Sequence, residues 1–217
     1  MKCHQPRRGF SLVEVLVTVS LIAALSALAV PISRAILTRS HAVNCASNLR
    51  QIGMATMMYA SDHSMTLPVT THQRRAGGMS WSLSLQPYAS GTVTFKCADD
   101  EEKSRPYTYL INDFLTPNPV GAPDLDFSRI SKIKRLETTF LFAEASATYL
   151  NSDHFHFSDY HGQAVPPAAF AEQVAVERHG GKSNFLFTDG HVETLSWKEV
   201  QIRLKATGSR FVDPSNP

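Results

Sequence analysis

The chain has 217 residues, of which 43% are hydrophobic and 18% are charged, so it can form an ordinary folded domain beyond an anchoring helix. Its 21 lysines and arginines against 19 aspartates and glutamates give a formal net charge of +2. Three of the basic residues lie within the first eight positions, so the rest of the chain is close to neutral. That balance argues against a nucleic-acid-binding surface.

An apolar run begins directly after this basic segment and covers residues 10–32, with Glu14 as its single charge. A helix of that length rises about 1.5 Å per residue and crosses the roughly 30 Å hydrocarbon core of a bilayer. The basic flank predicts a cytoplasmic N-terminus and an exported remainder. A secretory signal has a shorter apolar region of about 7–15 residues. A plain membrane anchor does not explain Glu14, because a charge at that depth costs a few kcal/mol.

Gly9, Phe10 and Glu14 form the string Gly-Phe-Ser-Leu-Val-Glu at the start of this run. The string resembles the cleavage and methylation site of type IV pilins and of type II secretion pseudopilins. The resemblance implies a leader over residues 1–9 that a prepilin peptidase removes, after which the same enzyme methylates the new Phe10 amine. Pro31 stands where those pilins carry a helix-bending proline.

The role of Glu14 in assembly follows from the resemblance and from burial. Cleavage leaves a cationic amine on Phe10, and in a bundle of parallel helices the Glu14 carboxylate of one subunit can face the Phe10 amine of a neighbour. Each charge alone is unfavourable in an apolar medium, whereas the pair sets the register of the helices.

Helical spacing of apolar residues resumes after Pro31 and continues to about Tyr59. We therefore expect one long helix bent at Pro31, because proline removes a backbone donor and clashes with the preceding turn. Residues 10–32 would form the transmembrane or filament-core part, and residues 33–60 would lay an apolar stripe on a head domain over residues 61–205.

Cys45 and Cys97 are the two cysteines outside the leader. An even pair in an exported domain predicts one disulfide, which would attach the end of the long helix to the head. Closing a loop of about fifty residues stabilises by roughly 4 kcal/mol in the chain-entropy model. The alternative is two buried free thiols.

The head reads as an α+β domain with a small antiparallel sheet. Residues 107–112 and 138–144 are apolar and aromatic runs typical of strands, and residues 92–97 alternate as a short strand would. Asp189-Gly190 between two strand-like runs predicts a hairpin whose two central residues take positive φ. A short amphipathic helix follows over 197–204, and residues 206–217 read as a loose tail.

His179 is followed by nine residues and then by Asp189 and Gly190. With the prepilin-type start, this spacing resembles the H-X9-DG subset of pilin-like proteins, as do the segments around Cys45 and Cys97. One hypothesis is a metal site made by His179, Asp189, His191 and Glu144, with calcium or zinc as the ion. The alternative is that Asp189-Gly190 is simply the turn and that the histidines bind backbone or solvent. On that alternative no cofactor is expected.

These features predict a structural subunit rather than an enzyme, because the chain has no Gly-x-Ser-x-Gly motif and no glycine-rich phosphate loop. The subunit would span the inner membrane once and then enter a type IV pilus or a type II secretion pseudopilus. Its expected partners are the prepilin peptidase and methyltransferase, other pilin or pseudopilin subunits, the inner-membrane assembly platform and lipid. The alternatives are a tethered head that binds metal or polysaccharide without polymerising, and a metal-dependent hydrolase.

Overall fold

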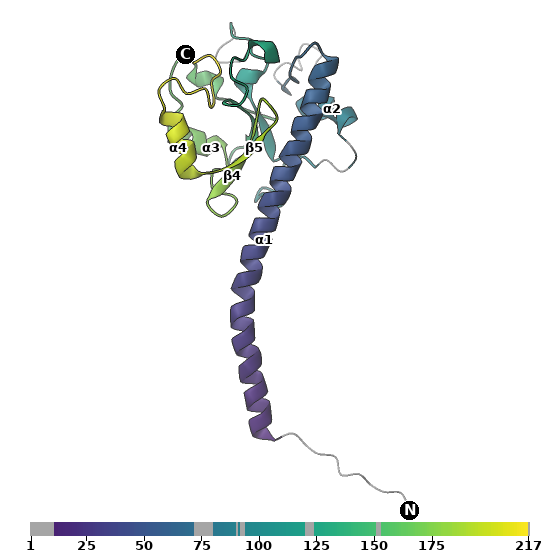
Figure 1. The fold of residues 1–217 in the computed structure, drawn as a ribbon, viewed down its shortest axis with the longest axis vertical. Coiled ribbons are helices and arrows are strands. Elements are labelled where there is room, and N and C mark those ends of the chain that lie inside the picture. Colours follow the sequence, from purple (N-terminus) through teal and green to yellow (C-terminus); the bar gives the residue numbers. More distant parts are fainter. Residues whose placement is uncertain are drawn as a thin grey trace, which may run out of the picture. The chain divides into compact units, whose positions relative to one another are not determined.

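The computed structural model describes residues 11–71, 80–89, 91, 94–119, 124–150 and 153–216 (Figure 1). The chain divides into two compact units, residues 1–39 and residues 40–217. The expected leader and Phe10 lie outside the described residues.

Helix α1 (Leu12–Asp62) has 51 residues and continues through both expected helical segments without a break. A reciprocal capping box starts it: the Ser11 amide donates to Glu14 Oε2 at 2.8 Å, and the Glu14 amide donates to Ser11 Oγ at 3.2 Å. The helix continues through position 31. The bend that we expect at Pro31 stays a prediction.

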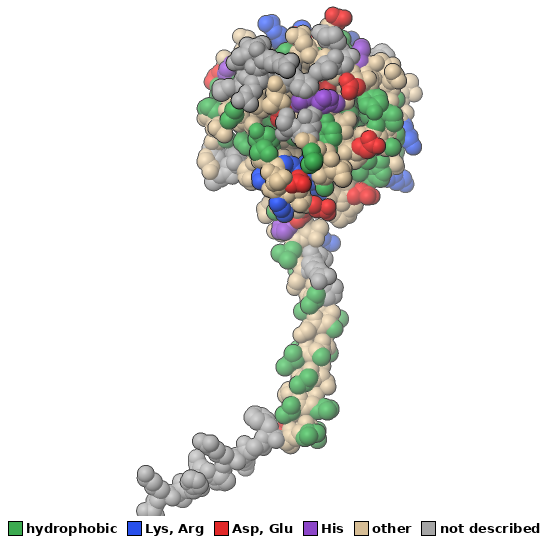
Figure 2. Space-filling view, turned by 180° about the vertical axis from the view of Figure 1, so that it is seen from behind, with side chains coloured by type: hydrophobic (Ala, Val, Ile, Leu, Met, Phe, Trp, Pro, Cys, Tyr) green, Lys and Arg blue, Asp and Glu red, His purple; other side chains and the backbone are tan. Residues whose placement is uncertain are grey.

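The segment Leu12–Val30 is a 19-residue stretch of α1 that is apolar enough to cross a membrane. It rises about 28 Å at 1.5 Å per residue, close to the thickness of a bilayer core. Its side chains are exposed, and Figure 2 shows hydrophobic groups along the visible face of this unit. None of the described residues of this unit covers this surface, as expected of a segment that is surrounded by lipid or by other helices.

Within the second unit, the last turns of α1 bury an apolar stripe that includes Leu49, Ile52 and Ala55. Gly53 lies on the same stretch, and a Cβ there would come within 2.9 Å of Leu186 Cδ1. The helix therefore approaches the sheet closely at this glycine.

The head contains a five-stranded sheet in the order β3-β1-β2-β4-β5. The strands are β1 (Tyr109–Asn112), β2 (Phe140–Glu144), β3 (His154–Phe155), β4 (Lys182–Phe187) and β5 (Val192–Ser196). The α+β class is as expected. The expectation of an antiparallel sheet is wrong at one edge, because β3 pairs with β1 in parallel. A long connection leads from β2 to β3, which lets the chain return in the direction of β1.

Both faces of the sheet are buried, each by its own cluster. Alternation along β4 sends Phe185 and Phe187 to one cluster and Leu186 to the other, which contains the α1 stripe. In β2 the alternation breaks at an irregularity between Phe140 and Phe142, so neighbouring Leu141 and Phe142 share the α1 side.

The cluster away from α1 is aromatic and centres on Phe140. Its ring centroid lies 5.3–6.1 Å from five other phenylalanine rings, within the range of favourable ring pairs. One of these rings is Phe211, which corrects the expected loose tail. Phe211 and Val212 are buried, and the Phe140 amide donates to Phe211 O at 3.0 Å.

Short elements complete the head. These are α2 (Trp81–Leu85), α3 (Pro167–Gln173) and α4 (Trp197–Lys205). The strand expected over residues 92–97 is not formed where the structure describes it, at residues 94–97, and residues 92–93 lie outside the described part.

The β4–β5 hairpin forms at Asp189-Gly190, but only Gly190 has positive φ, at 92°. The Gly190 amide donates to Phe187 O at 3.0 Å, and the Phe187 amide donates to His191 O at 2.9 Å. A tight turn closed by one left-handed glycine replaces the two-residue turn that we expected.

Candidate functional site

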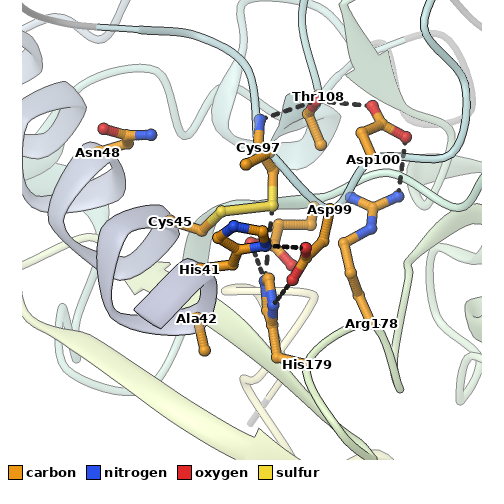
Figure 3. Close-up of a disulfide and its surroundings, with 12 residues drawn as sticks. His41, Ala42, Cys45, Asn48, Cys97, Asp99, Asp100, Thr108, Arg178 and His179 are labelled. Atoms are coloured by element: carbon orange, nitrogen blue, oxygen red, sulfur yellow. Dashed lines mark hydrogen bonds and ion pairs between the residues drawn. A yellow bond between two sulfur atoms is a disulfide. The ribbon is translucent and has the colours of Figure 1, made fainter. Parts of the chain in front are cut away.

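A disulfide joins Cys45 in α1 to Cys97 in the loop that precedes β1, with 5.4 Å between the Cα atoms (Figure 3). Both cysteines are buried. The structure therefore contains the disulfide that the even cysteine pair predicts, and it attaches the helix to the head.

His179 lies against this disulfide, between two carboxylates (Figure 3). Its Nε2 is 2.9 Å from Glu144 Oε1 and 3.6 Å from Cys97 Sγ, and its Nδ1 is 3.1 Å from Asp99 Oδ2. The imidazole and the Glu144 side chain are fully buried. Burial alone would lower the pKa of His179, but the hydrogen bonds and charges of Glu144 and Asp99 raise it.

Local structure explains how His179 reaches this position. Glu144 is the last residue of β2, and His179 precedes β4, the neighbouring strand. Gly180 and Gly181 follow His179 with φ of 66° and 84°, a conformation that favours glycine. The resulting turn lets the His179 amide donate to Lys182 O at 2.9 Å and directs the ring back towards the sheet.

Asp99 and His41 extend the site to α1, and neither is among the candidate site residues predicted from the sequence. The Asp99 carboxylate accepts from His41 Nδ1 as well as from His179, so it bridges an imidazole on the helix and one beside β4. His41 lies one helical turn before Cys45, and Asp99 lies two residues after Cys97. Each of them lies close in sequence to a cysteine of the predicted disulfide, and this nearness is the sequence feature from which both could have been predicted.

A buried ion-pair layer lies beside this site. Asp100 accepts from Arg105 and Arg178 at 3.0 and 3.1 Å and from Thr108 Oγ1 at 2.6 Å. Arg178 also donates to Ala145 O at 2.7 Å. The layer fixes the loop that carries Asp99, so it holds the disulfide and His179 in place.

The other two metal candidates lie elsewhere. β4 ends at Phe187, three residues beyond Asn184, which is the strand residue next to Glu144, and Asp189 and His191 follow that end. At about 3.3 Å per residue the strand alone separates them from Glu144 by about 10 Å. The four candidates therefore do not form one site: His179 and Glu144 meet, while Asp189 and His191 form a separate cluster with Glu193.

In that hairpin cluster the His191 ring lies between two carboxylates and stacks on Phe187. Its Nδ1 is 2.5 Å from Asp189 Oδ1, and its Nε2 is 3.0 Å from Glu193 Oε1. Arg203 of α4 donates to the other Glu193 oxygen at 2.6 Å. The arrangement fits a structural role, in which hydrogen bonds through His191 and Glu193 connect the Asp-Gly turn to Arg203 of the following helix.

We expect the pKa of His191 to lie above the ordinary histidine value. Partial burial lowers it, but the hydrogen bonds to Glu193 and Asp189 raise it by more. The stability that this charge contributes is therefore present at low pH and is lost as the pH rises through the raised pKa.

In an NMR titration Asp189→Asn should lower the pKa of His191, and Asp124→Asn, in another loop, should leave it unchanged. An unchanged pKa in Asp189→Asn would contradict the assignment.

One family model matches the chain, described as the prokaryotic N-terminal methylation motif, over residues 5–30. No curated protein and no solved structure matches the chain. The matched residues include Gly9, Phe10 and Glu14, of which the structure describes Glu14, at the first turn of α1. The motif and the apolar helix behind it support a pilin-like protein, a structural subunit rather than an enzyme, and fit a single-span membrane anchor.

Proposed function

We propose that the chain is a pilin-like subunit that is cut after Gly9, methylated on Phe10 and assembled into a type IV pilus or a type II secretion pseudopilus. The observation that carries the proposal is the methylation motif on the apolar segment Leu12–Val30 of α1, whose side chains are all exposed. A soluble protein does not expose an apolar surface of that size unless lipid or another protein covers it. In the precursor the cover is the bilayer, and in a filament it is the helices of neighbouring subunits.

Glu14 is the residue through which assembly would be specified. In the single chain its carboxylate accepts from the Ser11 amide at 2.8 Å, so it already caps the first turn of α1. In the assembled state the methylated Phe10 amine of an adjacent subunit would supply the positive charge that faces the Glu14 carboxylate. The prepilin peptidase, sister subunits, the assembly platform and lipid are the partners that this cycle requires.

Glu14→Leu is expected to insert into the membrane normally and to enter filaments at least about tenfold less, because a tenfold change corresponds to only about 1.4 kcal/mol and the buried amine would lose its partner. Thr18→Leu is the matched control: it removes a polar group one turn further along, whose hydroxyl donates to Val15 O within the same helix. Fractionation measures insertion, and sheared filaments measure assembly.

The mature N-terminus gives an independent test. Mass spectrometry of the membrane-extracted protein should find a chain that begins with methylated Phe10. An unprocessed chain, or filaments formed equally well by Glu14→Leu, would overturn the proposal. The methylation motif does not favour the alternative of a tethered binding domain, because a plain tether needs neither cleavage nor methylation.

A further inference from the structure

We propose that Cys45, Cys97, Glu144 and His179 form a binding site for zinc or a similar thiophilic divalent cation when the two cysteines are thiols. Both sulfur atoms, a Glu144 carboxylate oxygen and a His179 ring nitrogen lie within 4.8 Å of one another, and all four residues are buried. Donors of a tetrahedral zinc ion are about 3.3–3.8 Å apart, given metal–ligand distances of about 2.0–2.3 Å. Small rotations of the side chains cover the difference.

The surroundings of His179 are those of a metal ligand. A ligating histidine usually donates its other ring N–H to a carboxylate, which fixes the tautomer and the ring orientation. Asp99 Oδ2 stands 3.1 Å from Nδ1 and accepts its N–H, so Nε2, which faces Glu144 and Cys97, is the nitrogen at which a cation would take the place of the proton shared with Glu144. His41 in turn holds Asp99 from the helix.

Glu144 supplies a second, independent observation that points to a cation site. Its Oε1 faces His179 and the Asn184 amide, whereas its Oε2 is buried and has no hydrogen-bond partner within the described part of the chain. Buried carboxylate oxygens are normally satisfied, and a bound cation would satisfy this one.

The donor set selects the metal. Two thiolates, one imidazole and one carboxylate suit zinc, whereas calcium takes six to eight oxygen ligands. The calcium alternative raised by the sequence therefore has no support at this site. His191 and Asp189 take no part, since they lie at the other end of β4.

Metal and disulfide exclude each other because they use the same two sulfur atoms. Oxidation of the metal-bound dithiolate transfers two electrons to a disulfide-bearing oxidoreductase, which takes up two protons from water and is left as a dithiol, and the cation departs hydrated. Either state connects α1 to the loop at residue 97. The site thus links α1 to this loop through a metal ion before oxidation and through a disulfide after it.

Zinc content of the full chain in detergent tests the proposal. After reduction and removal of the reductant under anaerobic conditions, the chain should bind one zinc ion, and the oxidised chain none. Cobalt in place of zinc should give thiolate-to-metal charge-transfer absorption. If the reduced chain loses near-ultraviolet circular dichroism, zinc should restore it. A reduced chain that binds no zinc, or a reduced, unfolded chain that zinc does not refold, overturns the proposal.

Variants separate this site from loose binding by two thiols. Asp99→Asn should weaken zinc binding by about 10–100-fold, as loss of an outer carboxylate does elsewhere. His179→Ala with Glu144→Gln should weaken it further, and His191→Ala should leave it unchanged. Equal zinc affinity in the His179→Ala, Glu144→Gln variant would show that the thiols alone chelate the ion, which overturns the site.

Discussion

Replacing Cys45 and Cys97 together with serine is expected to lower the free energy of unfolding of the oxidised chain by about 4 kcal/mol. The disulfide spans a sequence separation of 52, and closing a loop of that length restricts the unfolded chain by about this amount in the entropy model. The measurement is urea denaturation in detergent, followed by tryptophan fluorescence, to which the fully buried Trp81 of the cluster that contains the α1 stripe contributes.

Reduction of the unaltered chain provides the control for this prediction. With a chelator present, the reduced chain should lose about the same stability as the serine variant, because both lose the cross-link. A loss below about 1 kcal/mol in both would mean that the unfolded chain is already restricted without the disulfide.

His179→Leu is expected to lower the free energy of unfolding of the oxidised chain by about 3–5 kcal/mol. The substitution leaves the Glu144 carboxylate buried without its partner at 2.9 Å, and removing one member of a buried pair carries that penalty. Adding Glu144→Leu should recover most of the loss, since the stranded charge is then gone.

This double-mutant comparison has its own control in the hairpin. His191→Leu removes a histidine that also contacts two carboxylates, but its side chain is 37% exposed, so the loss should stay below about 1 kcal/mol. If His179→Leu costs no more than His191→Leu, the contact between His179 and Glu144 does not stabilise the fold.

Elements with strong local patterns could be predicted from the sequence. The apolar run of α1, the aromatic run of β2 and the amphipathic pattern of α4 each specify their own structure, and the structure contains all three. β3 has two residues and exists only because β1 offers its edge. α3 lies in a segment without clear periodicity, and its one large apolar anchor, Phe170, has meaning only inside the aromatic cluster.

The site was partly predictable for the same reason. Cys45, Cys97, His179 and Glu144 have residue types that indicate chemistry, and the fold brings them together. Asp189 shares a motif with His179, and His191 follows that motif directly, but β4 extends between them and His179 and separates them. Asp99 looked like one more charge in a surface turn, and its carboxylate reaches His179 in a loop that the disulfide and the Asp100 ion pairs hold in place.

The disulfide also determines how the chain would respond to a pulling force. Tension entering along α1 would pass at Cys45 directly to Cys97, so the intervening stretch would carry no load. That stretch holds roughly 50 residues, and at about 3.5 Å each its hidden contour length is about 180 Å. When the oxidised head is pulled until it unfolds, its extended length should therefore be about 180 Å shorter than its number of residues allows. Reduction of the disulfide should restore this length.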